Sequence, residues 1–217
     1  MAYNIFIDTS IFDNQCFDFD NRQFKGLEKL RRDGLINIFI TDVIKAEVEN
    51  RIKYHVKNEA NIIRKDARIL NTYFNPNSKE IIDKLTNEFH EFIAKNIMVI
   101  DVPESRIGKK IISNYLNNMP PFDTAKEKKK QEFPDAFIIE TIADYLETND
   151  LTGIFLSGDN DCKTYIDDNN RLSHVKDIKE LLDKLNREND ECTNLIKQSL
   201  ESAKSNLDEV LTNFINS

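Results

Sequence analysis

Apolar residues along this chain fall into short runs that alternate with longer stretches, in which they recur at helical spacing. The short runs predict buried strands at 3–8, 35–41, 97–102 and 154–157, and a short fifth strand at 174–175. The longer stretches predict helices at 24–33, 43–73, 78–95, 105–118 and 135–146. Residues 119–133 are rich in proline, lysine and glutamate, and they predict a loop.

Strands that alternate with helices are typical of an α/β fold, because parallel strands need a crossover connection between them. We therefore expect a central parallel sheet in a domain that spans residues 1–187. Residues 188–217 predict a C-terminal helical extension with an apolar stripe. The stripe consists of Ile196, Leu200, Ala203, Leu207, Val210 and Phe214. Two explanations stay open, which are packing on the chain's own domain and a homodimer or protein-partner interface.

The composition is that of a globular protein without a membrane segment. Of the 217 residues, 40% are hydrophobic and 31% are charged, which is enough for one ordinary core. No apolar run approaches the roughly 20 residues needed to cross a bilayer, so no membrane partner is expected. The N-terminus lacks the basic region and cleavage site of a secretory signal. The three cysteines follow no disulfide or zinc pattern, so we expect a reducing, cytoplasmic setting.

Acidic residues stand where the predicted strands end and where the predicted helices begin. In open parallel sheets, ligands bind outside the carboxyl ends of the strands. Asp8 ends the first predicted strand, and Asp159 and Asp161 follow the fourth. Connecting helices run antiparallel to the strands, so Glu47 and Asp135, near helix starts, also belong to this edge. The topology therefore predicts that these carboxylates converge.

Such a gathering of carboxylates is unfavourable without a cation. Two like charges about 5 Å apart repel by roughly 3 kcal/mol at an effective dielectric constant near 20. Oxygen-liganded cations such as Mg²⁺ or Mn²⁺ relieve this repulsion and can activate water for phosphodiester hydrolysis. Asp135 also has a simpler interpretation, since an acidic residue beside Pro134 suits the first turn of a helix.

The acids occur in four motifs, which are IFIDTS, the glutamate of ITDVIKAEV, FPDAF and FLSGDND. Their order resembles that of the acidic motifs in PIN-domain metal-dependent ribonucleases, over roughly residues 3–175. The resemblance implies a three-layer α/β/α sandwich that cleaves RNA with Mg²⁺ or Mn²⁺. It assigns catalysis and metal binding to Asp8, Glu47, Asp135 and Asp159, an auxiliary metal-ligand role to Asp161, and water orientation to Ser10 or Ser157.

One stretch departs from the compact toxin members of that family. Residues 103–133 are longer, and they are similar to the lysine-rich approach found in larger bacterial PIN-like proteins. Both a toxin role and an RNA-processing role therefore stay open.

Positive charge is concentrated in one segment of an acidic chain. The net charge is −8, yet residues 105–130 carry seven basic groups against two acidic ones. We expect the lysines just before the FPDAF motif to bind nucleic-acid phosphates, although a solvated loop would show the same charges. These lysines are Lys126, Lys128, Lys129 and Lys130. RNA is the expected partner, with single-stranded DNA as the alternative.

Three other functions compete with the ribonuclease interpretation. A phosphatase of the haloacid dehalogenase type also places acids at strand ends, but it needs a second acid where this chain has Ser10. A PIN-like fold can serve as a non-catalytic binding module, although the chain keeps its acids. A DNA-directed structure-specific nuclease is the third alternative, because Asp159 and Asp161 stand close together.

Overall fold

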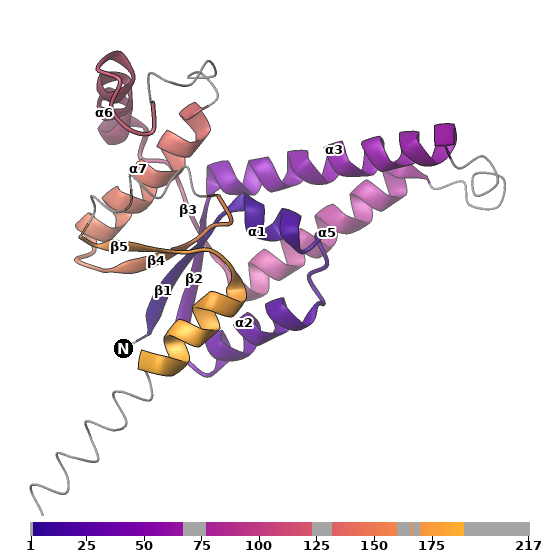
Figure 1. Ribbon diagram of the computed structural model, residues 1–217, viewed down its shortest axis with the longest axis horizontal. Coiled ribbons are helices and arrows are strands. Elements are labelled where there is room, and N and C mark those ends of the chain that lie inside the picture. Colours follow the sequence, from indigo (N-terminus) through magenta and orange to yellow (C-terminus); the bar gives the residue numbers. More distant parts are fainter. Residues whose placement is uncertain (1, 67–76, 123–131, 160–165, 167–169, 189–217) are drawn as a thin grey trace, which may run out of the picture. The chain divides into compact units, whose positions relative to one another are not determined.

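The computed structural model describes residues 2–66, 77–122, 132–159, 166 and 170–188 (Figure 1). The chain divides into two compact units, Met1–Ile178 and Lys179–Ser217. Residues 178–188 are helical. The predicted stripe at 196–214 lies outside the described residues, and the predicted domain boundary at 187 stays a prediction.

A sheet of five parallel strands forms the centre of the first unit, as the alternation of strands and helices predicts. The strand order is β3-β2-β1-β4-β5, and each neighbouring pair runs parallel. The strands are β1 (Tyr3–Ile7), β2 (Ile36–Thr41), β3 (Met98–Ile100), β4 (Gly153–Leu156) and β5 (Leu172–Val175). Since β1 lies between β2 and β4, its carboxyl end is at the middle of the sheet.

The helices occupy the predicted stretches, and two further helical segments were not predicted, which are α1 (Thr9–Asn14) and residues 178–188. The other helices are α2 (Arg22–Arg32), α3 (Asp42–Asp66), α5 (Ser78–Asn96), α6 (Glu104–Leu116) and α7 (Phe133–Thr148). The sequence prediction missed α1, because six residues are too few to show a helical period. The predicted helix 43–73 is confirmed as far as Asp66, and its last part lies outside the described residues. No helix within the described ranges is both long and apolar enough to cross a membrane.

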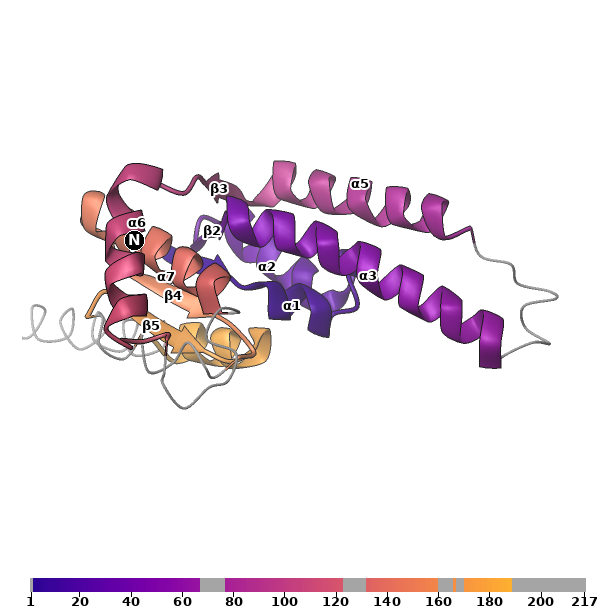
Figure 2. The same ribbon diagram turned by 90° about the horizontal axis from the view of Figure 1, so that it is seen from above.

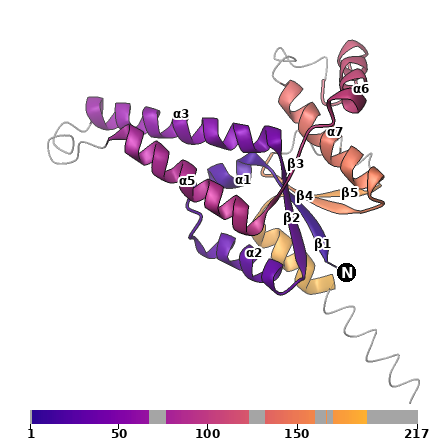
Figure 3. The ribbon, with the colours of Figure 1, turned by 180° about the vertical axis from the view of Figure 1, so that it is seen from behind.

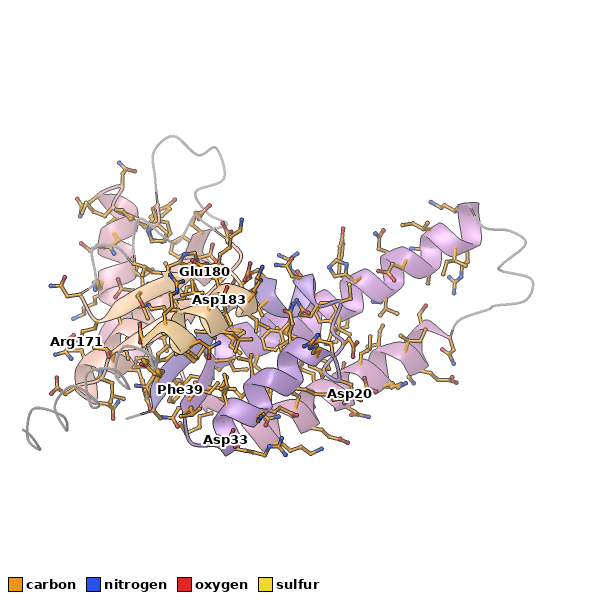
Figure 4. All side chains as sticks on the ribbon, turned by 60° about the horizontal axis from the view of Figure 1, so that its bottom comes forward. Asp20, Asp33, Phe39, Arg171, Glu180 and Asp183 are labelled. Atoms are coloured by element: carbon orange, nitrogen blue, oxygen red, sulfur yellow. The ribbon has the colours of Figure 1, made fainter. Side chains whose placement is uncertain are left out.

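Helix α7 covers one face of the sheet (Figures 1 and 3). The ring centroid of Tyr145 lies 6.3 Å from that of Phe6 and 5.4 Å from that of Phe39. Figure 4 shows Phe39 among the side chains near the sheet, whereas Asp20 lies at the outer surface. At Gly153, a β-carbon would come within 2.5 Å of the Phe6 ring, so this ring needs a glycine beside it.

A cluster of phenylalanines joins α1 and α2 to α5 on the other side of the sheet. Phe12 of α1 stacks on Phe24 of α2 at 5.7 Å and meets Phe89 of α5 edge-on at 5.5 Å. Phe12, Phe24 and Phe89 are fully buried, and burial of each side chain contributes about 1.5–3 kcal/mol. This packing fixes α1, which begins directly after the first strand.

Helices α3 and α5 pack side by side (Figure 2). Ile44, Val48 and Ile52 are fully buried and recur every fourth residue along α3. Glu49, on another side of the helix, contacts His90 of α5 at 2.8 Å. Glu49 is therefore paired with a residue of α5, unlike Glu47.

Two ion pairs fasten α6 to α7. Arg106 contacts Asp144 at 2.7 Å, and Lys110 contacts the buried Glu140 at the same distance. Both cations belong to the predicted basic segment 105–130. Two of the seven basic groups in this segment are thus used in ion pairs within the protein. Lys126, Lys128, Lys129 and Lys130 lie outside the described residues.

Candidate functional site

The strand order reverses its direction at β1. The chain passes from β1 to β2 on one side and reaches β4 on the other, and ligands bind at such reversal points in open α/β sheets. Asp8 follows β1, and its backbone N–H donates to the carbonyl of Leu156 in β4 at 2.9 Å. The segment Ser157–Asp159 follows β4 directly. The two strand ends are therefore joined where the sequence places its acids.

Asp8 is held in one orientation by three hydrogen bonds. It is the N-cap of α1, and its Oδ2 accepts from the backbone N–H of Ser10 at 3.2 Å. The hydroxyls of Ser10 and Ser157 donate to the same oxygen at 2.6 and 2.9 Å. Among the residues that the structure describes, Oδ1 of Asp8 has no hydrogen-bond partner.

The two serines are themselves held by the loop after β4. The Ser10 hydroxyl accepts from the backbone N–H of Gly158 at 2.9 Å, and the Ser157 hydroxyl accepts from that of Asp159 at 3.1 Å. Nε2 of His174 donates to the carbonyl of Ser157 at 2.9 Å. These bonds fix Asp8 and the start of the Asp159 loop together. The water-orienting role of Ser10 or Ser157 stays a prediction.

Glu47 is oriented by a residue that the sequence analysis did not identify. The buried hydroxyl of Thr9 donates to Oε2 of Glu47 at 2.7 Å, so the residue after Asp8 positions the acid of α3. The available signal was the polar pair Thr9 and Ser10 between Asp8 and the apolar Ile11. The sequence does not say which residue the Thr9 hydroxyl contacts. Its role in positioning Glu47 therefore became clear only from the fold.

Asp135 lies in the first turn of α7 and is half-buried. Its pKa is raised from 3.8 to about 7, first by burial and then by the negative charges of Asp8, Glu132, Glu47 and Asp159. A carboxyl group responds in this way only when those charges are near it. The charges of Asp8, Glu47 and Asp159 thus contribute to the raised pKa of Asp135, after burial. The metal-binding and catalytic roles of these acids stay a prediction.

Glu132 is a further acid near Asp135. The sequence placed it in a loop that ends at residue 133, but α7 begins at Phe133, with Glu132 as its N-cap residue. The prediction was wrong at this boundary, because Pro134 is accommodated in the first helical turn rather than ending the loop. Three-residue spacing from Asp135 puts both carboxyls on one side of the helix start.

The donors fit a hard divalent cation. All are carboxylate oxygens, and the raised pKa of Asp135 shows that its charge is poorly compensated by the protein itself. Within the described residues, however, no three acidic, histidine or cysteine side chains stand close enough to form a finished metal site. Asp161 lies outside the described residues.

The five-stranded parallel sheet with helices packed on it is consistent with a PIN-like α/β sandwich. A PIN-domain family model matches residues 5–162, which is more than half of the chain. The chain belongs to the PIN-domain family, whose members are generally nucleases and typically use divalent metals. Comparison with curated proteins finds no match. The resemblance of the acidic motifs is therefore confirmed at the level of the family.

Proposed function

We propose that this PIN domain is an endoribonuclease that hydrolyses RNA phosphodiester bonds with Mg²⁺ or Mn²⁺. The observation that supports it best is the hydrogen-bonded placement of Asp8 and Glu47, together with Asp135, whose pKa is raised by burial and by their charges. Acids that only capped helices or covered the surface would not be gathered in this way. The proposal extends the family's general nuclease character to a substrate and a cofactor.

Each residue has a defined part in the proposal. Asp8 presents Oδ1 to the cation while its other oxygen is held by Ser10 and Ser157. Glu47, fixed by Thr9, and Asp135 approach from the starts of α3 and α7. Asp159 completes the set from the loop after β4, and Asp161 is proposed as an auxiliary ligand from the same loop.

A bound divalent cation supplies a more acidic water and stabilises negative charge on the phosphate. The chain's own contribution is to orient the carboxylates of Asp8 and Glu47 by hydrogen bonds. Lys126, Lys128, Lys129 and Lys130 are proposed to attract the RNA backbone toward an otherwise acidic protein. The RNA preference is supported by the resemblance of the motifs, and both a toxin and an RNA-processing role remain compatible with it.

A cytoplasmic setting is proposed with it. Cys16 is an exposed free thiol, which suits a reducing compartment.

A cleavage assay tests the function. The full chain is incubated with single-stranded RNA and with single-stranded DNA of the same sequence, in Mg²⁺, Mn²⁺ or EDTA. We expect RNA cleavage with either metal, none in EDTA, and none with Asp8→Asn or Asp135→Asn. Asp144→Asn is the matched control, because Asp144 lies on the same helix but pairs with Arg106.

The outcomes separate the alternatives. Cleavage of DNA alone would support the DNA-directed nuclease. Absence of all cleavage by a chain that still binds nucleic acid would support the binding module. Cleavage that survives Asp8→Asn and Asp135→Asn would contradict the site.

A further inference from the structure

A surface pocket lies on α3 directly beside the carboxylates. It has a volume of about 350 Å³ and is lined by Glu47, Asn50, Arg51 and Tyr54. These residues are three, four and seven positions apart, so they form one face of the helix. Glu47 belongs both to this pocket and to the acidic site. Anything bound in the pocket is therefore next to the proposed cation.

Tyr54 gives the pocket an exposed aromatic wall. Its relative exposure is 61%, and it is the one aromatic residue among the strongly exposed large hydrophobic residues in the described part of the chain. Tyr54 contacts the ring of His55 edge-on at 5.5 Å, which supports the side of the ring and orients it. Nucleobases stack on aromatic faces presented in this way.

Arg51 gives the pocket a positive charge beside an acidic site. Its Nη1 lies 3.6 Å from Oδ2 of Asp13 in α1, and about half of its side chain remains exposed. The other oxygen of Asp13 lies 3.4 Å from Nε2 of His55, without hydrogen-bond geometry. Asp13 thus anchors Arg51 from one side. A guanidinium carries five N–H donors, so a single ion pair leaves donors for a phosphate.

We propose that this pocket binds one unpaired nucleotide of the RNA substrate, with Tyr54 stacked on its base and Arg51 on an adjoining phosphate. The inference rests on the proposed ribonuclease function, which it deepens by naming a subsite. The pocket volume lies within the range of small-ligand sites, about 300–1,000 Å³. A base in a duplex is already stacked and paired, so this subsite selects single-stranded RNA.

The test measures RNA binding by fluorescence anisotropy in the full chain that carries Asp8→Asn, which prevents cleavage. The probe is a labelled single-stranded RNA, compared with the same sequence in a duplex. We expect Tyr54→Ala to weaken single-stranded binding by about 5- to 150-fold. Tyr54→Phe keeps the ring and should bind within about twofold of the parent. Arg51→Ala should weaken binding and reduce its salt dependence by about one phosphate contact.

Lys53→Ala is the matched control. Lys53 is an exposed cation on the same helix but does not line the pocket. A scan of single abasic sites along the RNA adds a second readout, since removal of the stacked base should reproduce the loss seen with Tyr54→Ala. In the RNA that lacks the stacked base, Tyr54→Ala should cause no further loss of binding affinity.

Four results decide the inference. Binding unchanged by Tyr54→Ala, or weakened equally by Lys53→Ala and Arg51→Ala, overturns it even if the parent chain cuts RNA. Tyr54-dependent binding by a chain that never cuts RNA supports the subsite and overturns the proposed catalysis. A chain that neither binds nor cuts RNA overturns both. Tight duplex binding that also depends on Tyr54 overturns the single-strand preference.

Discussion

Replacement of Asp135 by asparagine should stabilise the metal-free protein at pH 8, although it removes a proposed metal ligand. The pKa of Asp135 is raised from 3.8 to about 7 by burial and by neighbouring carboxylates. Such a shift corresponds to about 4 kcal/mol at most, at about 1.4 kcal/mol for each pH unit. Because Asp135 is only half-buried, solvent screening reduces the expected gain to about 2 kcal/mol.

The pH dependence has a defined sign. A carboxyl whose pKa is raised by folding binds its proton more tightly in the folded state than in the unfolded state. Its favourable contribution is fully present below pH 3.8 and is lost as the pH rises toward about 7. The Asp135→Asn variant carries no ionisable group there. The two proteins should therefore be equally stable near pH 4 and should differ most above pH 7.

Urea unfolding in EDTA, at pH 4 and at pH 8, measures this difference. At pH 8 the variant should also melt about 4–8 °C higher, since 1 kcal/mol shifts Tm by about 2–4 °C in a domain of this size. Asp144→Asn should show no such gain, because Asp144 is compensated by Arg106 at 2.7 Å. A variant at position 135 that is less stable than the parent at pH 8, or that differs equally at both pH values, would refute the reasoning.

Three further predictions concern residues that support the site or the sheet. Ser157→Ala removes a hydrogen bond to Asp8 and one from the Asp159 amide, and kcat on RNA should fall by about 10- to 100-fold in a cleavage assay. Thr9→Val releases Glu47, so the Kd for Mn²⁺ measured by calorimetry should rise about tenfold; an unchanged Kd would show that Glu47 needs no positioning. Gly153→Ala places a methyl group against the Phe6 ring and should lower the free energy of unfolding by about 1–3 kcal/mol in urea.

The sheet and the position of the acids could be predicted because both follow from local patterns. Buried parallel strands appear as short apolar runs, and a residue directly after such a run, like Asp8, must lie at the carboxyl edge. Asp135 and Glu47 followed from the direction in which connecting helices run. The order of elements was therefore enough to bring the acids of distant motifs to one edge.

The contacts that orient those acids could not be predicted in the same way. The hydrogen bond from Thr9 to Glu47 joins residues 38 positions apart, and that from Ser157 to Asp8 joins residues 149 apart. No sequence period encodes such pairs, since they depend on how α1 packs through Phe12. The exposure of Tyr54 likewise became visible only once the buried face of α3 was defined.

The central claim is that Asp8, Glu47, Asp135 and Asp159 form one site for a divalent cation. Titration calorimetry with Mn²⁺ at pH 6, in buffers of different ionisation enthalpy, counts the protons that leave the protein on binding. With its pKa near 7, Asp135 is mostly protonated at pH 6, so the parent chain should release close to one proton per Mn²⁺. Asp135→Asn should bind Mn²⁺ more weakly and release almost none. Mn²⁺ binding with equal affinity and equal proton release in both proteins would contradict the claim.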